Sequence, residues 1–186
     1  MVEFKLGKSG KQFLIKGATA YWAKVQKPVP KHKAKNGEMQ YEIKVFVTEA
    51  IVDQMDAASL NKAPPSIADK NKKSMKKKGE VAYPVEFDDM FELSLASSST
   101  WADGKPKDLA VVKDNKPFKD NIGNGSIVDV IGYIGKQNDE GLHTVYLDKV
   151  KVVTLVEYEG DADFDFDISG DEDDFGGVDD DDDTPF

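Results

Sequence analysis

Hydrophobic and polar residues alternate along much of the first 158 positions, and a period of two predicts β-strands. The stretch 39–47 shows the pattern best, because one face of such a strand would carry only apolar side chains: Tyr41, Ile43, Val45 and Val47. The other face places Lys44 beside Phe46. Strand-like segments also occur at 13–25, 81–87, 91–99, 127–135 and 143–158. The chain is therefore expected to be mainly β.

Other segments show turn or helix signals. Thr48 can cap a short helix over 49–58, in which Ile51, Met55 and Ala58 recur at helical spacing. The segment 69–80 has six lysines between positions 70 and 78 and is expected to be a mobile basic loop.

Short strands, bends at glycines such as Gly17 and one short helix favour a small β-barrel. The expected architecture is an oligonucleotide-binding (OB) fold, a five-stranded closed or partly open barrel. A β-sandwich stays open as an alternative, because periodicity does not distinguish the two.

Charge divides the chain. The net charge is −10, but residues 161–186 hold 13 acidic residues and no basic one, so residues 1–160 carry +3. A block of like charge repels itself and is typical of disordered interaction tails. We therefore expect a flexible basic N-terminus (1–12), an OB-fold domain (13–160) and a disordered acidic tail (161–186).

Residue types that are missing from the sequence narrow its class. There is no cysteine, which agrees with a reducing cytoplasm, and no apolar stretch approaches the ~20 residues that span a bilayer. All 25 basic residues are lysines. Lysine acts as a point charge and lacks the planar fork with which arginine reads guanine, so binding to a nucleic-acid backbone is favoured over base reading.

Catalytic and metal motifs are weak. The two histidines, His32 and His143, belong to no recognised catalytic arrangement. Residues 165–176 reproduce the first half of a calcium loop, but Gly176 stands where a bidentate glutamate is needed. We expect a protein that is not an enzyme and has no cofactor and no specific metal site.

Lysines near aromatic residues suggest single-stranded nucleic acid as a ligand, because rings stack on bases and lysines contact phosphates. The candidate stacking residues are Trp22, Phe46, Trp101 and Tyr146. The candidate phosphate contacts are Lys16, Lys24, Lys44, Lys72, Lys73, Lys76, Lys77 and Lys78. The alternatives are that a given ring packs in the core and that the 70–78 run is only a solvated loop.

The last residues, Asp179, Asp180, Asp181, Asp182 and Asp183 followed by Thr184, Pro185 and Phe186, resemble the tip of bacterial single-stranded DNA-binding proteins. The body is similar to the T7-like phage proteins of the same function. That similarity rests on Gly17 to Trp22, Lys24 with Pro28, the stretch 122–130 and the final strand from Leu147 to Val153.

This resemblance implies an OB-fold that coats single-stranded DNA in phage replication, recombination and repair, within the host bacterial cytoplasm. It also implies that the tail, through its aspartates, Pro185 and Phe186, contacts DNA polymerase and helicase-primase. A homodimer is left open. Two other classes remain: an acidic-tailed chaperone for basic proteins, and an RNA-binding module of cold-shock type.

Overall fold

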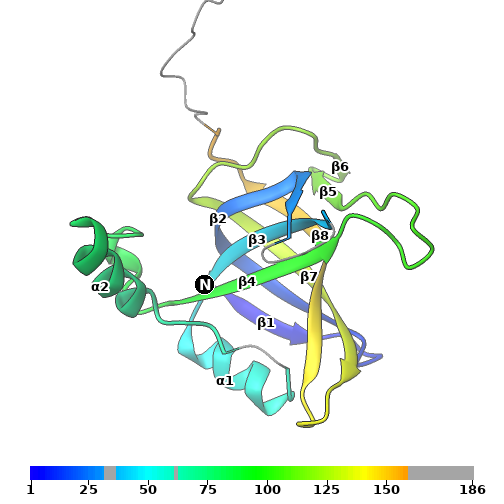
Figure 1. Ribbon diagram of the computed structural model, residues 1–186, viewed down its shortest axis with the longest axis horizontal. Coiled ribbons are helices and arrows are strands. Elements are labelled where there is room, and N and C mark those ends of the chain that lie inside the picture. Colours follow the sequence, from blue (N-terminus) through cyan, green and yellow to red (C-terminus); the bar gives the residue numbers. More distant parts are fainter. Residues whose placement is uncertain (32–36, 61–62, 159–186) are drawn as a thin grey trace, which may run out of the picture.

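A computed structural model describes residues 1–31, 37–60 and 63–158. Within these residues the chain forms β-strands with two α-helices and one 3-10 helix (Figure 1). The elements are β1 (Glu3–Leu6), β2 (Gln12–Pro30), β3 (Met39–Val47), α1 (Glu49–Ala57), α2 (Ile67–Lys78), η1 (Val85–Phe87), β4 (Phe91–Ser98), β5 (Ala110–Lys113), β6 (Lys116–Pro117), β7 (Ser126–Gln137) and β8 (His143–Thr154). The mainly β class is confirmed.

The strands form one eight-stranded sheet in the order β4-β3-β2-β7-β8-β5-β6, with β1 paired to β2. Neighbours are antiparallel except β5, which runs parallel to β8. In the described part of the chain no ladder joins β4 to the other end of this order, so the closed form of the predicted barrel is not found. One continuous sheet also differs from the two stacked sheets of a β-sandwich.

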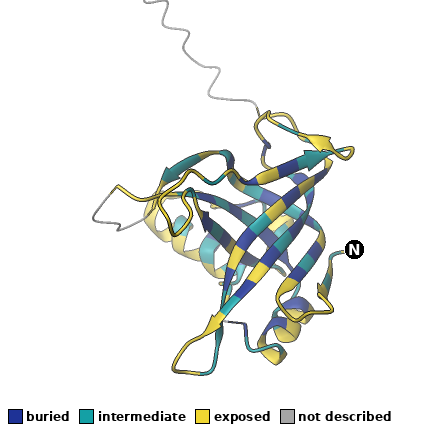
Figure 2. Ribbon diagram, turned by 90° about the vertical axis from the view of Figure 1, so that its right-hand side faces the viewer, coloured by how far each residue is buried: buried dark blue, intermediate teal, exposed yellow. Residues whose placement is uncertain are grey.

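The core lies on the inner side of the sheet, where alternate residues are buried (Figure 2). The apolar face predicted for 39–47 is confirmed, since Ile43, Val45 and Val47 are fully buried. In α1, Ile51 and Met55 face this core as the helical spacing predicts. The strand expected at 81–87 is wrong, because that segment holds η1.

Helix α2 occupies the segment expected to be a mobile loop, and that expectation is wrong. Ser66 caps the helix by accepting a hydrogen bond from the Asp69 N–H, and Gly79 ends it in the left-handed conformation (φ 78°). Lysines in the last turn lie at the negative end of the helix dipole and stabilise it. No helix among the described residues is long and apolar enough to cross a membrane.

A polar residue anchors α2. Asn71 is 4% exposed, and its side-chain amide donates to the Tyr83 carbonyl and the Asp88 carboxylate. Its side-chain oxygen accepts from the backbone N–H groups of Ala82 and Tyr83. Buried and fully hydrogen-bonded, Asn71 fixes the 82–88 segment against the helix.

The close approach between β2 and β7 depends on Gly132. A Cβ built there would overlap the Phe13 ring, which is itself 1% exposed. We predict that Gly132→Ala lowers the free energy of unfolding by about 1–3 kcal/mol, the usual cost of overpacking, as measured by urea denaturation. Combining it with Phe13→Leu should recover part of the loss. Two fully additive losses would contradict the steric explanation.

Candidate nucleic-acid interface

The outer side of β2, β3 and β4 forms the candidate interface, called the β2–β4 face below. Its middle row consists of Tyr21, Lys44 and Ser94, which are direct cross-strand neighbours. Helix α2 and η1 precede β4 and the segment 99–109 follows it, so they lie at opposite ends of that strand (Figure 1). An extended ligand along β4 would meet both.

Trp22 is displayed on this face by a β-bulge in β2. Between Tyr21, which pairs with Lys44, and Lys24, which pairs with Glu42, β2 contains one extra residue relative to β3. Trp22 has a positive φ of 50°, and its N–H donates to the Asn124 side-chain oxygen at 2.9 Å. Bulges of this kind re-aim a side chain. The indole is accordingly 50% exposed on a strand whose flanking residues are partly covered.

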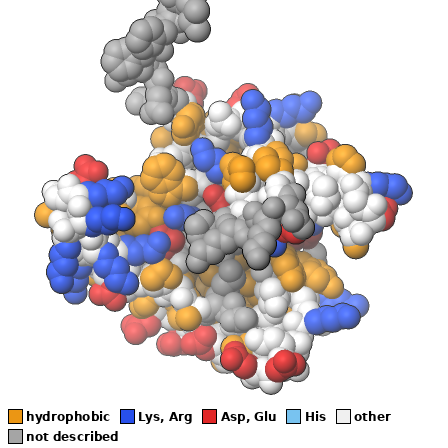
Figure 3. Space-filling model, in the orientation of Figure 1, with side chains coloured by type: hydrophobic (Ala, Val, Ile, Leu, Met, Phe, Trp, Pro, Cys, Tyr) orange, Lys and Arg blue, Asp and Glu red, His pale blue; other side chains and the backbone are white. Residues whose placement is uncertain are grey.

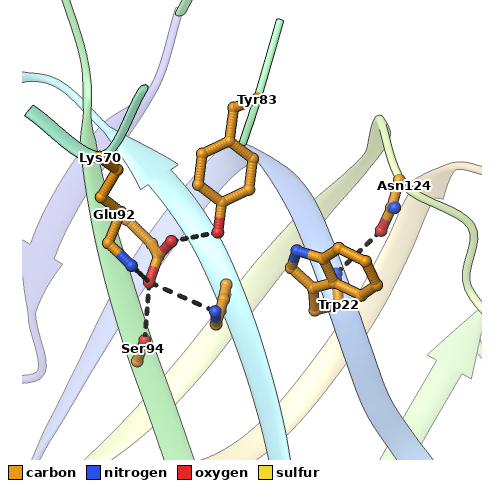
Figure 4. A network of polar contacts seen from close by, with 7 residues as sticks. Trp22, Lys70, Tyr83, Glu92, Ser94 and Asn124 are labelled. Carbon is orange, nitrogen blue, oxygen red and sulfur yellow. Dashed lines mark hydrogen bonds and ion pairs between the residues drawn. The ribbon is translucent and has the colours of Figure 1, made fainter. Parts of the chain in front are cut away.

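A buried carboxylate organises the basic side chains next to Trp22. Glu92 is 3% exposed and lies 2.7 Å from Lys70 Nζ and 3.6 Å from Lys44 Nζ (Figure 4). The Tyr83 hydroxyl donates a short hydrogen bond to the same carboxylate. Glu92 therefore connects α2, the 82–88 segment, β3 and β4 at one point.

The protonation states of this network follow from its contacts. Burial and the neighbouring Glu92 carboxylate raise the pKa of Tyr83, while a hydrogen bond from the Trp22 side chain partly offsets the rise. Burial favours protonated Glu92, but hydrogen bonds from Lys70 and Tyr83 and the charge of Lys44 hold its pKa below the ordinary value. Near neutral pH the network therefore contains an anionic Glu92 and a neutral Tyr83, and the hydroxyl of Tyr83 links the carboxylate to the indole.

Exposed lysines cover the remaining surface of α2. Lys73, Lys76, Lys77 and Lys78 are exposed, and Lys72 lies 3.8 Å from Asp69 at the surface. Figure 3 shows the lysines of this helix gathered beside hydrophobic side chains. Helix α2 keeps these lysines within one short segment, and its Lys70 reaches Glu92, which also pairs with Lys44.

In two further places a lysine lies over an aromatic ring. One follows the bulge in β2, and the other follows the end of β4. Trp101 is 57% exposed, and Lys107 Nζ lies 4.9 Å from its ring centroid while donating to the Ser97 hydroxyl. Lys24 is exposed, with Nζ 5.8 Å from the Tyr158 ring centroid. Both rings are already close to a cation before any ligand arrives.

Phe46 requires a correction. It lies on the same outer side as Lys44, as the alternation predicts, but its side chain is fully buried. Residues folded over β3 enclose it: its ring stacks on Tyr21 at 4.6 Å and meets Tyr83 at 5.2 Å and Phe87 at 5.0 Å. Phe46 is thus a support beneath the face and not a stacking platform.

Two predicted site residues lie elsewhere. Lys16 lies in the N-terminal half of β2, where it is the cross-strand neighbour of Glu3 in β1. Tyr146 lies on β8, opposite Tyr133 of β7. Trp22, Lys24 and Lys44 lie on the β2–β4 face, the predicted lysines of α2 lie on the helix that precedes β4, and Trp101 follows β4. The tail residues Asp179 to Asp183, Pro185 and Phe186 lie outside the described residues.

Sequence reasoning missed Tyr83, Glu92 and Asn124, which position the exposed groups. The only signal for Glu92 was an acid placed among the apolar residues of 91–99. Asn124 lies in the stretch 122–130, for which the sequence showed only a similarity to the phage proteins.

A hollow of about 1040 Å³ opens between the end of β2, β5–β6 and residues 155–158. Its walls include the apolar residues Val25 and Phe118. Three acidic residues, Asp108, Asp120 and Glu157, outnumber the lining lysines Lys27 and Lys119. This charge balance disfavours phosphates in the hollow.

Comparison with known proteins gave no match to a family model and none to a curated protein sequence. Solved structures do match. The bacteriophage Enc34 single-stranded DNA-binding protein in complex with single-stranded DNA is 16% identical, with a TM-score of 0.52 over 83% of this chain and 92% of that chain. A C-terminal truncation of the Enc34 protein is 17% identical, with a TM-score of 0.55 over 83% and 91%.

A third match comes from another phage. Gp2.5, the single-stranded DNA-binding protein of bacteriophage T7, is 18% identical, with a TM-score of 0.51 over 82% of this chain and 96% of that chain. The chain has the fold of phage single-stranded DNA-binding proteins. The predicted structural resemblance is confirmed, and the open sheet is the form that an OB-like fold takes here.

The Glu92 network predicts a pH dependence of stability. Because folding lowers the pKa of Glu92 from 4.5, its contribution is present above that pH and is lost as the pH falls through the lower, folded value. The difference in unfolding free energy between the wild type and Glu92→Gln should shrink below about pH 4.5 in urea titrations. Glu49→Gln, at an exposed position of α1, is the control. A difference independent of pH would contradict the proposed ionisation.

Proposed function

We propose that this protein binds single-stranded DNA on the β2–β4 face with little dependence on base sequence. The observation that carries the proposal is the exposed Trp22 indole, displayed by a bulge between Tyr21 and Lys24 of β2, with Lys44 opposite Tyr21 on β3. The fold supports it, since one structural neighbour is described in complex with single-stranded DNA.

The proposed contacts divide into stacking and charge. Trp22 and Trp101 offer rings for bases, each stack contributing about 1–3 kcal/mol whatever the base. Lys24, Lys72, Lys73, Lys76, Lys77 and Lys78 offer point charges for phosphates. Neither set distinguishes one base from another, so the binding energy depends on chain length and salt more than on sequence.

Lys44 and Lys70 would act differently from the exposed lysines. Both are about two-thirds covered and already paired with Glu92, so a phosphate has to compete with that carboxylate. Among the exposed α2 lysines, Lys72 lies 3.8 Å from Asp69, whereas Lys73, Lys76, Lys77 and Lys78 form no ion pair within the described residues and would make the first contacts. In this scheme Glu92 keeps the two inner lysines extended toward the face, which lowers the entropy lost when DNA binds.

For residues 161–186 we propose an acidic tail with two roles. Its 13 acids, tethered to a basic domain, would compete with DNA for the lysines. The tip, Asp179 to Asp183 with Pro185 and Phe186, would dock on DNA polymerase or helicase-primase by its ring and terminal carboxylate. The protein would thus act without catalysis in phage replication, recombination and repair, in the host bacterial cytoplasm.

The first prediction of the proposed function concerns the α2 lysines. Changing Lys76, Lys77 and Lys78 together to Glu should weaken binding to all sequences alike and reduce the salt slope of the binding constant by about 0.7 for each phosphate that the variant no longer neutralises. Tryptophan fluorescence titration with poly-dT at several salt concentrations measures both. The matched control changes Lys113, Lys116 and Lys119, near the acidic hollow, to Glu.

The control separates a local effect from the overall change in net charge. Equal effects of the two triple variants would show that the α2 lysines act only through the overall charge of the protein.

Trp22→Ala should weaken DNA binding about five- to a hundredfold, because the base loses its stacking partner, whereas Trp22→Phe should retain most of the affinity. Unchanged affinity of Trp22→Ala at low salt would overturn the site.

The second prediction concerns the tail. Deleting residues 161–186 should raise DNA affinity, most at low salt, where the acids are least screened. Deleting Phe186 alone should leave DNA affinity nearly unchanged but weaken binding to a replication polymerase about ten- to a hundredfold, because a buried phenyl ring contributes roughly 1.5–3 kcal/mol. Surface plasmon resonance with each ligand tests both.

The alternative functions give different results in the same assays. If deleting 161–186 abolishes activity toward a basic client protein and DNA affinity is absent, the chain is an acidic-tailed chaperone. If ribo-oligomers compete better than deoxy-oligomers, the site uses 2′-hydroxyls and the protein is an RNA-binding module. Binding of oligo-dT in preference to oligo-rU supports the proposal.

A further inference from the structure

A second surface lies on the outer side of β1, β2, β7 and β8, and its rows follow from the strand register. One row runs through Gln12, Tyr133 and Tyr146. The next runs through Lys5, Leu14, Ile131 and Lys149. We call this surface the β7–β8 face; Figure 2 views the sheet from the right-hand side of Figure 1 and shows exposed residues alternating with buried ones along its strands.

The centre of the β7–β8 face is a pair of exposed rings. Tyr133 and Tyr146 are direct cross-strand partners, and each is 45% exposed. The Tyr146 ring lies over Gly135, since a Cβ built on that glycine would be 2.8 Å from ring atom Cε2. Gly135 therefore leaves room for the ring to lie against β7, as a stacking platform requires.

Charge on this face is biased toward lysine. The acidic groups have partners: Glu3 lies 3.2 Å from Lys5 Nζ, Asp129 accepts from the Gly17 N–H at 2.9 Å, and Asp148 accepts from the Gln12 side chain at 3.0 Å. Lys149 and Lys151 are exposed on β8, and neither forms an ion pair with any residue in the described ranges. Aromatic rings flanked by uncommitted lysines match single-stranded nucleic acid better than an apolar partner.

The two faces are joined through β2. Residues 12–20 of β2 pair with β7 along one edge, and residues 19–30 pair with β3 along the other. Gly17 (φ 69°) bends the strand within the part that pairs with β7. The faces thus lie on opposite sides of one long strand. A ligand that covers both has to be longer than one that covers the β2–β4 face alone.

We propose that the β7–β8 face is a second contact surface for single-stranded DNA, engaged only by strands that extend past the β2–β4 face. Tyr133 and Tyr146 stack on bases, and Lys149 and Lys151 contact phosphates. The proposal rests on the proposed function and adds to it a binding mode that depends on strand length.

The test compares Tyr133→Ala/Tyr146→Ala with the wild type on oligo-dT of increasing length, across the range of about 4–16 nucleotides that OB folds cover and beyond. The variant should match the wild type on short strands and lose about five- to a hundredfold per ring on long ones. Tyr133→Phe/Tyr146→Phe, which keeps both rings, should bind like the wild type at every length.

Two further variants test the same surface without removing a ring. Gly135→Ala should displace the Tyr146 ring and reduce affinity for long strands only. Lys149→Gln/Lys151→Gln should lower the salt slope by about 0.7 for each phosphate left without its lysine, again on long strands only. Urea denaturation of each variant establishes that it is folded.

Three results would overturn the proposal. Equal affinity of the double alanine variant and the wild type at all lengths shows that DNA does not use the face. Equal weakening on short and long strands assigns the tyrosines to the first site. A change in the sedimentation of the DNA-free protein identifies the face as an interface between copies of the chain. Failure of the proposed function is distinguishable, because Trp22→Ala would then bind like the wild type even on short strands.

Discussion

Strand β2 has to pair with β1, β3 and β7, and this demand determines where the exposed rings can lie. A straight strand of 19 residues could not serve partners on both edges while the sheet coils around one core. The strand therefore takes one extra residue against β7, next to Gly17, and another against β3, at Trp22. The first bends the strand within the part that pairs with β7. The second turns an indole outward, with Asn124 holding the backbone in place.

The Glu92 carboxylate converts this backbone geometry into a defined surface. Burying a carboxylate costs free energy unless charges and hydrogen bonds compensate it, and here Lys44, Lys70 and Tyr83 do so. The consequence for binding is mixed, because the same interactions that order the two lysines also neutralise part of their charge. In the proposed binding mode, long-range attraction of a phosphate backbone would depend on the exposed lysines of α2, and the inner pair would contribute only at contact distance.

Alternation of apolar and polar residues predicted the longer strands and the two faces of β3 correctly. It did not predict burial that arises when one segment of the chain folds over another. Alternation placed Lys44 and Phe46 on one side of β3, which is what the structure shows. It did not reveal that residues 65–90 fold over Phe46, because this contact is distant in sequence and leaves no pattern in the residues around Phe46. Helix α2 was missed because its anchor is the polar Asn71 in place of an apolar stripe, although Ser66 and Gly79 stood at cap positions.

The chain shares its fold with structural neighbours that are only 16–18% identical to it, so the fold constrains few residue identities. A coiled sheet requires apolar residues at alternate inward positions and space at close approaches, such as that between Phe13 and Gly132, and many sequences satisfy both. The outward positions carry no such requirement. Exposed rings and lysines have to be explained by what they bind, and a shared fold does not transfer them from one protein to another. Trp22 on one side of β2 and the Tyr133–Tyr146 pair on the other each depend on a local feature, a bulge and a glycine, that leaves the rings exposed. This exposure supports the proposal that both sites contact a ligand.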